Sequence, residues 1–378
     1  MFMKIALLLT RSVIYPSMAF DIMDGFKSSL KKLGVEGKHE IVSSNIGVAG
    51  KNEEIYICCE QLLLNNTDII IAYINPITAE FIHPLFENSG KLLIVLDSGY
   101  HFPIFQQKLS NAHFISLEGN LCSRAIVRKA AEEGLQDFAF TCSFYDAGYR
   151  PPYTYSTSVE DKGGSITYNH ITPLKRSDFS LEPLAGYLEE NKDAALLTSF
   201  CGDMAEDFFR ESSKFKSIIS CKIYGSGFTA EEFWLSKIPY PGYNWSSSIP
   251  WSLTIVSEEN KDFVTTMENI RQNKANIFSL LGWEAALFIE AANEKSLDAI
   301  TIHSPRGKVY MNPVTGFSSA PIYYATVAKN KETGNCQLED ITEAENLDEE
   351  RSRLQYHILA VQNVTSNSWF NAYACLES

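Results

Sequence analysis

The fold is decided by the stretch Lys4-Ile-Ala-Leu-Leu-Leu-Thr10 and by the loop Arg11-Ser-Val-Ile-Tyr-Pro-Ser17 that follows it. A short apolar run between polar residues predicts a strand buried on both faces of a parallel sheet. After the loop, apolar residues recur every three or four positions from Phe20 to Leu33, and Gly34 stands where a helix C-cap glycine belongs. The opening therefore predicts a strand, a loop and a helix, and ligands bind at such strand-end loops in open α/β sheets.

This unit recurs along the chain. Apolar strand patterns and helical spacings alternate up to Gly119, which predicts a doubly wound parallel sheet, and the rhythm then restarts as a second sheet. The expected strands cover residues 4–10, 39–47, 68–74, 91–96, 113–117, 138–144, 165–172, 194–200 and 217–224. Further on, the pattern predicts one long helical region over 262–294 with a break at Gly282, and a solvated helix or mobile linker over 339–353.

Length and charge limit the classes of protein. A chain of 378 residues predicts two domains. A net charge of −14 argues against nucleic acid and against an anionic membrane surface as partners. No stretch reaches the ~20 apolar residues of a membrane span, so direct membrane insertion is not expected.

The N-terminus and the cysteines bear on the compartment. The apolar run after Lys4 is too short for a signal-peptide core, so we expect a cytoplasmic protein as the chain stands, or a periplasmic one if a leader is missing. The eight cysteines show no CxxC spacing and lie mostly in apolar runs, which favours buried free thiols over a disulfide framework.

Catalytic and cofactor motifs are absent from the sequence. It contains no GxSxG, HExxH, GxxxxGK[ST] or GxGxxG after the first strand, and no two histidines stand at helical spacing. We therefore expect no cofactor, no metal and no enzyme. An enzyme on the same scaffold is the rival reading, and Cys201 beside Asp203 is its only candidate nucleophile.

Polar and aromatic residues gather at the predicted strand ends. Tyrosine offers a flat apolar body with a polar tip, Ser and Asn can hold a carboxylate, and Asp can hold an ammonium group. Such a set predicts a site for a small polar or zwitterionic ligand. The alternative is that these residues only form turns. The candidates are Ser12, Tyr15, Asn75, Asp97, Ser98 and Tyr100 in the first lobe, and Tyr145, Asp146, Tyr149, Cys201, Tyr224 and Ser226 in the second.

From Lys4 to Val327 the sequence resembles the type I periplasmic-binding-protein family, in its branched-chain amino-acid (leucine/isoleucine/valine-binding) branch. The resemblance rests on four stretches in a fixed order. They are Ile5-Ala-Leu-Leu-Leu with Tyr15-Pro-Ser-Met-Ala-Phe-Asp-Ile-Met-Asp-Gly25, Phe144-Tyr-Asp-Ala-Gly-Tyr149, Gly282-Trp-Glu-Ala-Ala286, and Ser304-Pro-Arg-Gly-Lys-Val-Tyr310.

The resemblance implies an α/β fold of two Rossmann-like lobes, each a parallel sheet flanked by helices, joined by a three-crossing hinge. The crossings would lie near Gly119, Ser252 and Pro321. Residues 1–119 and 253–321 would form the first lobe, and residues 120–252 and 322–378 the second. The tail after Lys329 is longer than the family pattern needs, and its apolar end, with Trp369, Phe370 and Tyr373, predicts that it docks on the second lobe.

The resemblance also implies where a ligand is held. The loops after the third and fourth strands would bind its carboxylate, and Tyr145 or Tyr149 would supply an aromatic contact from the second lobe. Ser12 and Tyr15 would then form part of one jaw of a cleft, facing Tyr145. The family's acidic partner for an ammonium group belongs near 224–227, where this sequence has no carboxylate, although Asp146 or Asp97 could substitute.

We therefore expect a solute-binding protein that encloses a small polar ligand, an amino acid or a related metabolite, between two lobes. The resemblance implies ABC-type transport with a membrane permease as partner. A cytoplasmic ligand sensor that signals to a protein partner is the alternative.

Overall fold

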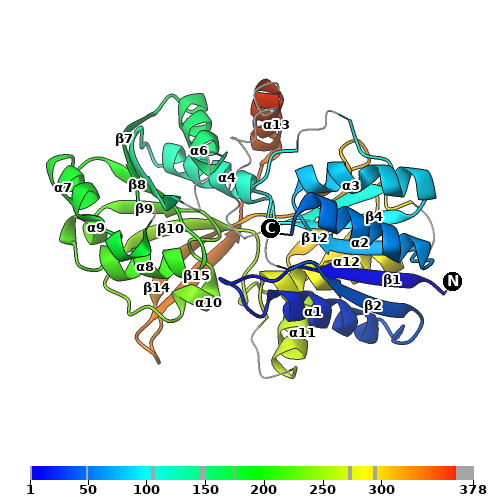
Figure 1. Ribbon diagram of the computed structural model, residues 1–378. Coiled ribbons are helices and arrows are strands. Elements are labelled where there is room, and N and C mark those ends of the chain that lie inside the picture. The colour runs from blue at the N-terminus through cyan, green and yellow to red at the C-terminus, as the bar shows by residue number, and fades with distance from the viewer. Residues whose placement is uncertain are drawn as a thin grey trace. The chain divides into compact units, whose positions relative to one another are not determined.

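The computed structural model describes residues 2–47, 50–103, 107–144, 150–173, 175–270, 275–292 and 296–362. These residues form two compact units (Figure 1). Unit 1 consists of residues 2–117 and Leu253–Pro321, and unit 2 of Glu118–Ser252 and residues 322–362. In the described part of the chain, no helix has both the length and the apolar character needed to cross a membrane.

Unit 1 is built on a five-stranded parallel sheet in the order β2-β1-β3-β4-β5, as the opening stretch predicts. A small antiparallel sheet, β11-β12-β13, is added to it. The strands are β1 Lys4–Leu9, β2 Glu40–Asn45, β3 Ile69–Tyr73, β4 Leu92–Asp97, β5 Ala112–Ser116, β11 Thr301–Ser304, β12 Gly307–Met311 and β13 Ser318–Ser319. The helices are α1 Met18–Lys32, α2 Asn52–Leu64, α3 Pro76–Ser89, α11 Glu258–Glu268 and α12 Ile277–Ala292.

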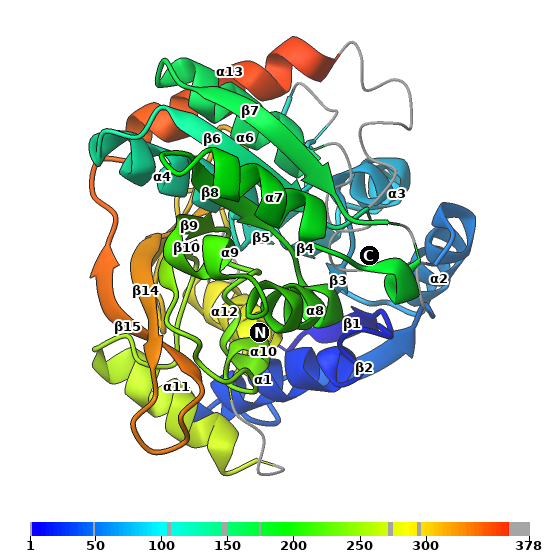
Figure 2. The same ribbon diagram turned by 90° about the vertical axis from the view of Figure 1, so that its left-hand side faces the viewer.

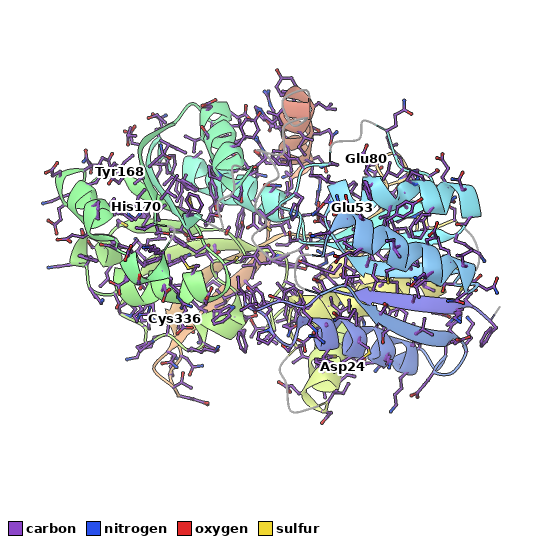
Figure 3. All side chains as sticks on the ribbon, viewed as in Figure 1. Asp24, Glu53, Glu80, Tyr168, His170 and Cys336 are labelled. Atoms are coloured by element: carbon purple, nitrogen blue, oxygen red, sulfur yellow. The ribbon has the colours of Figure 1, made fainter. Side chains whose placement is uncertain are left out.

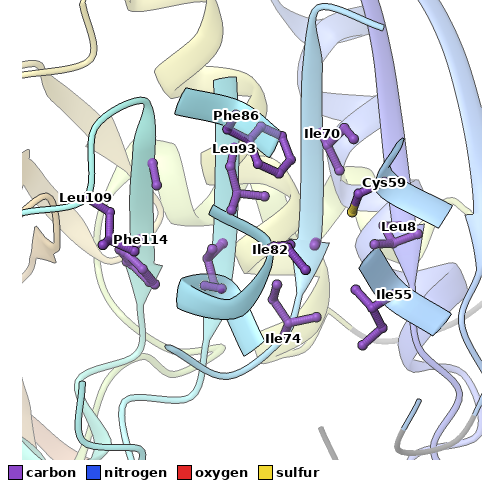
Figure 4. Close-up of a cluster of buried hydrophobic side chains, with 14 of the residues drawn as sticks. Leu8, Ile55, Cys59, Ile70, Ile74, Ile82, Phe86, Leu93, Leu109 and Phe114 are labelled. Carbon is purple, nitrogen blue, oxygen red and sulfur yellow. The ribbon is translucent and has the colours of Figure 1, made fainter. Parts of the chain in front are cut away.

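One face of the unit 1 sheet packs against α2 and α3. Leu8, Ile70 and Leu93 point from three neighbouring strands toward Cys59 of α2 and Phe86 of α3 (Figure 4). All five side chains are fully buried. Each such apolar side chain contributes about 1.5–3 kcal/mol on burial, which explains why the central strands are apolar on both faces.

The other face packs against α1 and α12, and two glycines set how closely these helices approach. A Cβ on Gly25 would lie 2.0 Å from the carbonyl oxygen of Ser279, and a Cβ on Gly282 would lie 2.0 Å from that of Ile22. The predicted break at Gly282 is therefore wrong: this glycine lies inside α12 and makes room for the backbone of α1. The predicted single helix over 262–294 is also wrong, because α11 ends at Glu268 and α12 begins at Ile277.

Unit 2 is built on a seven-stranded sheet in the order β15-β14-β10-β9-β8-β6-β7, in which β14 and β15 run antiparallel to their neighbours. Helices α4 and α6 cover one face, and α7, α8 and α9 the other (Figure 2). The strands are β6 Asp137–Cys142, β7 Ser165–Ile171, β8 Ala195–Ser199, β9 Lys222–Gly225, β10 Asn244–Ile249, β14 Tyr323–Lys329 and β15 Cys336–Glu343. The helices are α4 Gly119–Glu132, α6 Arg150–Asp161, η1 Arg176–Asp178, α7 Glu182–Glu190, α8 Gly202–Ser212, α9 Lys216–Ser220, α10 Glu232–Leu235 and α13 Asp348–Gln362.

Two expectations for unit 2 are wrong. The predicted strand over 217–224 is a short helix, α9, followed by a shorter strand, β9. The hydroxyl of Ser220 donates to the carbonyl of Lys216, a local bond that supports the helical turn. The expected solvated helix or mobile linker over 339–353 is wrong for residues 339–343, which belong to strand β15 paired with β14, whereas helix α13 covers residues 348–353.

Helix α13 is fastened to unit 2 by a buried arginine. Arg124 of α4 is fully buried and donates from Nε to Glu350 of α13 (2.9 Å) and from Nη2 to Asp161 of α6 (2.7 Å). His357 of α13 also lies 3.0 Å from Asp161. This stretch of mixed charge therefore contains an ordered helix, several of whose charged side chains form ion pairs. The tail expected to dock on the second lobe begins after Lys329. Its described part, which holds β15 and α13, packs within unit 2, and residues 363–378 lie outside the described part.

Candidate ligand-binding site

The strands of the unit 1 sheet are all parallel, so their carboxyl ends meet at one edge. Strands β1, β3, β4 and β5 are neighbours there. The residues predicted for the first lobe all lie at the carboxyl ends of the first three of these strands or in the loops that follow them. The fold thus brings to one edge Ser12, Tyr15, Asn75, Asp97, Ser98 and Tyr100.

The loop after β1 is shaped by its own side chains. The hydroxyl of Ser12 accepts a hydrogen bond from the backbone N–H of Tyr15 at 2.9 Å, which makes a tight turn. The Tyr15 ring meets Phe278 edge-on, with 4.9 Å between centroids, and Phe278 meets Tyr73 in the same way at 5.9 Å. Phe278, at the start of α12, is a residue that the sequence reading missed.

Asn75 has a structural task at the end of β3. Its side-chain oxygen accepts from the N–H of Thr78 at 2.8 Å and so caps α3. The α3 N-terminus with its partial positive charge therefore lies at the same edge as the other candidates.

The loop after β4 is the most polar part of this edge, and all of its candidates are buried. Asp97, Ser98 and Tyr100 are at most 3% exposed. The Ser98 hydroxyl accepts from the N–H of Tyr100, and the hydroxyl of Ser116, at the end of β5, donates to Asp97 at 3.3 Å.

His101 follows Tyr100 in the segment between β4 and β5, and the sequence analysis did not select it. Its side chain is 4% exposed, and Nδ1 lies 3.9 Å from Oδ1 of Asp97. The search for histidine pairs could not find it, because its partner is a carboxylate. An Asp four residues before a His in a strand-end loop was the available signal.

In unit 2, the described candidates hold their own loops together. Cys201 is the N-cap residue of α8 and is fully buried. The hydroxyl of Ser226 lies 3.1 Å from that of Thr229, whose own hydroxyl donates to the carbonyl of Phe200. The loops after β8 and β9 are thereby linked.

Tyr224 points toward helix α4. Its hydroxyl donates to Glu133 at 2.6 Å, just beyond the carboxyl end of that helix. Burial, together with this carboxylate, raises the pKa of Tyr224 above its usual range. Three further candidates, Tyr145, Asp146 and Tyr149, lie outside the described residues.

His170 lies near the end of β7, the edge strand of unit 2, where Figure 3 shows it beside Tyr168. Its Nδ1 lies 3.0 Å from the hydroxyl of Thr141. Burial lowers the pKa of His170, so the ring is neutral at neutral pH. It therefore adds no positive charge to this edge of unit 2.

Glu231 stands in the stretch after β9, a few residues beyond the segment 224–227 in which the sequence shows no carboxylate. Its Oε1 accepts from the N–H of Phe233, and Oε2 has no hydrogen-bond partner in the described structure. Burial raises the pKa of Glu231 to about 7. This side chain is therefore poised to change charge near neutral pH.

Neither metal binding nor catalysis gains support from these contacts. The described residues contain no group of three or more His, Cys, Asp or Glu side chains placed to hold a metal ion. Asp203, the neighbour of Cys201 in the rival reading, forms an ion pair with Arg176. The seven cysteines in the described part are free thiols; five are buried, as expected, and Cys58 and Cys221 are half-buried.

The two α/β units and the polar residues at the carboxyl edge of the unit 1 sheet are typical of a binding protein. Residues 3–331 match the family model described as periplasmic binding protein. That match spans most of the 378 residues, so the chain belongs to the periplasmic-binding-protein family. The resemblance drawn from the sequence is confirmed. A search of curated protein sequences finds no match.

Solved structures with the same fold cover nearly all of the chain. An ABC transporter substrate-binding protein from Sphaerobacter thermophilus has a TM-score of 0.77 and 15% identity, over 91% of this chain and 98% of its own. A solute-binding protein from Rhodopseudomonas palustris BisB5, in complex with 3,4-dihydroxybenzoic acid, has a TM-score of 0.72 and 17% identity, over 92% and 99%. The leucine-, isoleucine-, valine-, threonine- and alanine-binding protein from Brucella ovis, in a closed conformation, has a TM-score of 0.69 and 13% identity, over 91% and 96%.

Proposed function

We propose that this protein is the solute-binding component of an ABC-type transporter and that its ligand is a small polar molecule, an amino acid or a related metabolite. The observation that carries the proposal is the buried polar loop after β4, in which Asp97, Ser98 and Tyr100 stand beside His101 at the carboxyl edge of a parallel sheet. Polar groups buried in a strand-end loop suit a ligand more than a simple turn, which would leave them in water.

The proposal extends to the arrangement of the chain and its partners. We propose that units 1 and 2 are the two lobes, with the hinge crossings near 119, 252 and 321, and that both lobes contribute loops to the ligand. If the ligand has a higher affinity for the closed conformation than for the open one, its binding shifts the population toward the closed conformation. The protein would work in the periplasm with a membrane permease, as its family membership supports.

Two measurements test the proposal. Native mass spectrometry of gently purified protein should show a trapped small molecule. A thermal-shift screen with leucine, valine, benzoate, 4-hydroxybenzoate and 3,4-dihydroxybenzoate should identify a stabilising compound, because a ligand at 100 times its Kd adds about 2.7 kcal/mol of stability.

The variants then locate the site. The Tyr145→Ala, Ser98→Ala double variant should lose the ligand-induced stabilisation, whereas Ser89→Ala should keep it. Ser89 is a matched control because it is exposed and ends α3, at the opposite edge of the unit 1 sheet. Full stabilisation of the double variant would refute the site, and chemical conversion of the compound during incubation would favour an enzyme.

A further inference from the structure

The segment that holds helices α2 and α3 of unit 1 is acidic throughout. Residues 52–90 include six Asp or Glu residues and neither Lys nor Arg. Asp68 pairs with Lys91 at 2.6 Å, and Glu87 accepts from the hydroxyl of Ser110 at 3.3 Å. In the described structure the remaining four form no ion pair: Glu53, Glu54, Glu60 and Glu80.

Exposed apolar residues alternate with carboxylates along one side of α2. Ile57 and Leu64 are 52% and 77% exposed, so this side is open to solvent. Glu53 and Glu60 stand four residues before Ile57 and Leu64 respectively. The resulting spacing of i, i+4, i+7 and i+11 places all four residues on one side of the helix. That side lies opposite to the residues that α2 buries against the sheet.

Helix α3 lies beside α2 and extends this surface. The Tyr56 ring of α2 meets the Phe81 ring of α3 edge-on, with 5.9 Å between centroids, and Phe81 is 44% exposed. Glu80 precedes Phe81, and Figure 3 shows Glu80 and Glu53 on these two adjacent helices. Partial burial raises the pKa of Glu80, as expected for a carboxylate with apolar neighbours. The α2–α3 face is the set Glu53, Ile57, Glu60, Leu64, Glu80 and Phe81.

We propose that the α2–α3 face docks a segment of a partner protein in which Lys or Arg residues alternate with apolar ones. The cations of the segment neutralise the three carboxylates of the face, and its apolar side chains cover Ile57, Leu64 and Phe81. Two helices that lie side by side offer a groove to such an amphipathic segment. This inference goes beyond the proposed function, because it concerns a protein partner of unit 1 and not the ligand.

The charge of the α2–α3 face argues against other occupants. The three carboxylates repel an anionic membrane surface and nucleic acid. A twofold axis would bring the same patch of two copies together, so that each acidic strip would face its own like charges. A basic segment of another protein is the occupant that fits both the charge and the apolar side chains.

Fluorescence polarisation with labelled peptides tests the inference on the full-length protein. The probe is a peptide of about 18 residues, or five helical turns, with Leu and Lys at helical spacing. One comparison peptide has Glu in place of each Lys, and another has Ser in place of each Leu. Wild type should bind the Leu/Lys peptide at least about 10-fold more tightly than either comparison peptide, because docking requires both charge and apolar contact.

Two triple variants with the same change in net charge test the carboxylates of the face. Glu53→Gln, Glu60→Gln, Glu80→Gln should weaken binding of the Leu/Lys peptide about 10-fold. The control should change the Kd less than about threefold, because long-range attraction to the whole protein is screened by salt. It removes three exposed carboxylates from α7 of unit 2: Glu182→Gln, Glu189→Gln and Glu190→Gln.

Two double variants test the apolar contact. Ile57→Ser, Leu64→Ser should weaken binding about 10-fold through the loss of buried apolar area. Val256→Ser, Val314→Ser changes two exposed residues of unit 1 outside α2 and α3 and should leave the Kd within about threefold. Thermal unfolding of both variants should match that of wild type, because all four side chains are exposed.

The outcomes decide between the occupants. The inference is overturned if the Leu/Lys peptide does not bind wild type, or if the two triple variants have equal Kd values. A wild-type dimer in sedimentation analysis that dissociates in Ile57→Ser, Leu64→Ser would assign the face to a second copy and overturn the inference as well. None of these results bears on the proposed function, which the ligand measurements test separately.

Discussion

Among the described side chains, each unit buries one arginine completely, but the two arginines have different partners. In unit 1, Arg306 meets the single carboxylate of Glu284, itself fully buried, and supports the strand end that carries Ser116. In unit 2, Arg124 meets Asp161 and Glu350, and Glu350 has a second cationic neighbour, Lys162, at 2.6 Å.

We propose that the first arginine supports the candidate ligand site, whereas the second holds a helix onto its unit. The Arg306 pair reaches Ser116 at the carboxyl edge of the unit 1 sheet, where the proposed ligand loops lie, and the Arg124 cluster reaches helix α13 of unit 2. A buried ion pair is costly to desolvate and adds little net stability, so its retention is best explained by the geometry that it fixes.

The largest expected effect comes from breaking these arginine contacts. Arg306→Leu should lower the free energy of unfolding of unit 1 by about 3–5 kcal/mol, because Glu284 is left as an unpaired buried charge. Arg124→Leu should cost unit 2 only about 1–3 kcal/mol, since Lys162 and His357 still face its carboxylates. Hydrogen exchange in urea, followed on peptides from each unit, measures the two separately.

The Glu284→Leu, Arg306→Leu double variant serves as the control. It should recover most of the stability lost in Arg306→Leu, because no unpaired charge remains. If Arg306→Leu and Arg124→Leu lowered the free energy of unfolding equally, the proposed difference between the two arginines would be refuted.

Helix packing gives the second test of the comparison. Gly282→Ala in unit 1 should cost up to about 3 kcal/mol, because the new methyl group would clash with the backbone carbonyl of Ile22. Gly186→Ala in α7 of unit 2 should instead stabilise by about 0.5–1 kcal/mol, since nothing lies within 4 Å of a Cβ there and alanine favours helix. Thermal unfolding of both variants measures whether each substitution raises or lowers stability. A stabilising Gly282→Ala would show that α1 and α12 can move apart without cost.

These glycines also show what sequence patterns can and cannot reveal. The apolar runs predict β1, β3, β4 and β5 of unit 1, because strands buried on both faces carry a local signal. Gly282 was read as a helix break because the local signal of a helical glycine is the same whether it bends the helix or faces another backbone. Likewise, β15 was missed because its exposed acidic residues obscure a pairing with β14 that only tertiary structure reveals.

The candidate site was partly predictable for a similar reason. The loop positions follow from the strand ends, so residues such as Ser98 and Tyr100 could be selected from sequence. Their partners could not: Phe278 reaches Tyr15, and Arg306 reaches Ser116, from segments that are remote in the chain. His101 could have been selected from the sequence, because the carboxylate nearest to it, Asp97, is only four residues away in the chain.

The smallest expected effect concerns the buried carboxylates. Glu284 is paired with Arg306, whereas Oε2 of Glu231 in unit 2 has no hydrogen-bond partner in the described structure, and burial raises the pKa of Glu231 from 4.5 to about 7. Because the folded pKa lies above the unfolded one, this residue's stabilising contribution is complete below pH 4.5 and is lost as the pH rises through about 7.

The side chain of the Glu231→Gln variant cannot ionise. The free energy of unfolding of this variant, relative to that of wild type, should therefore increase by about 1 kcal/mol between pH 5 and pH 8. This value includes a reduction for the solvent that reaches the partly buried side chain. Urea unfolding of unit 2 at several pH values measures this difference. Glu189→Gln, an exposed change on α7 of the same unit, should show no such trend. A flat difference for Glu231→Gln would mean that a cation or a hydrogen-bond donor compensates Glu231 after all, and the contrast with Glu284 would then rest on the arginines alone.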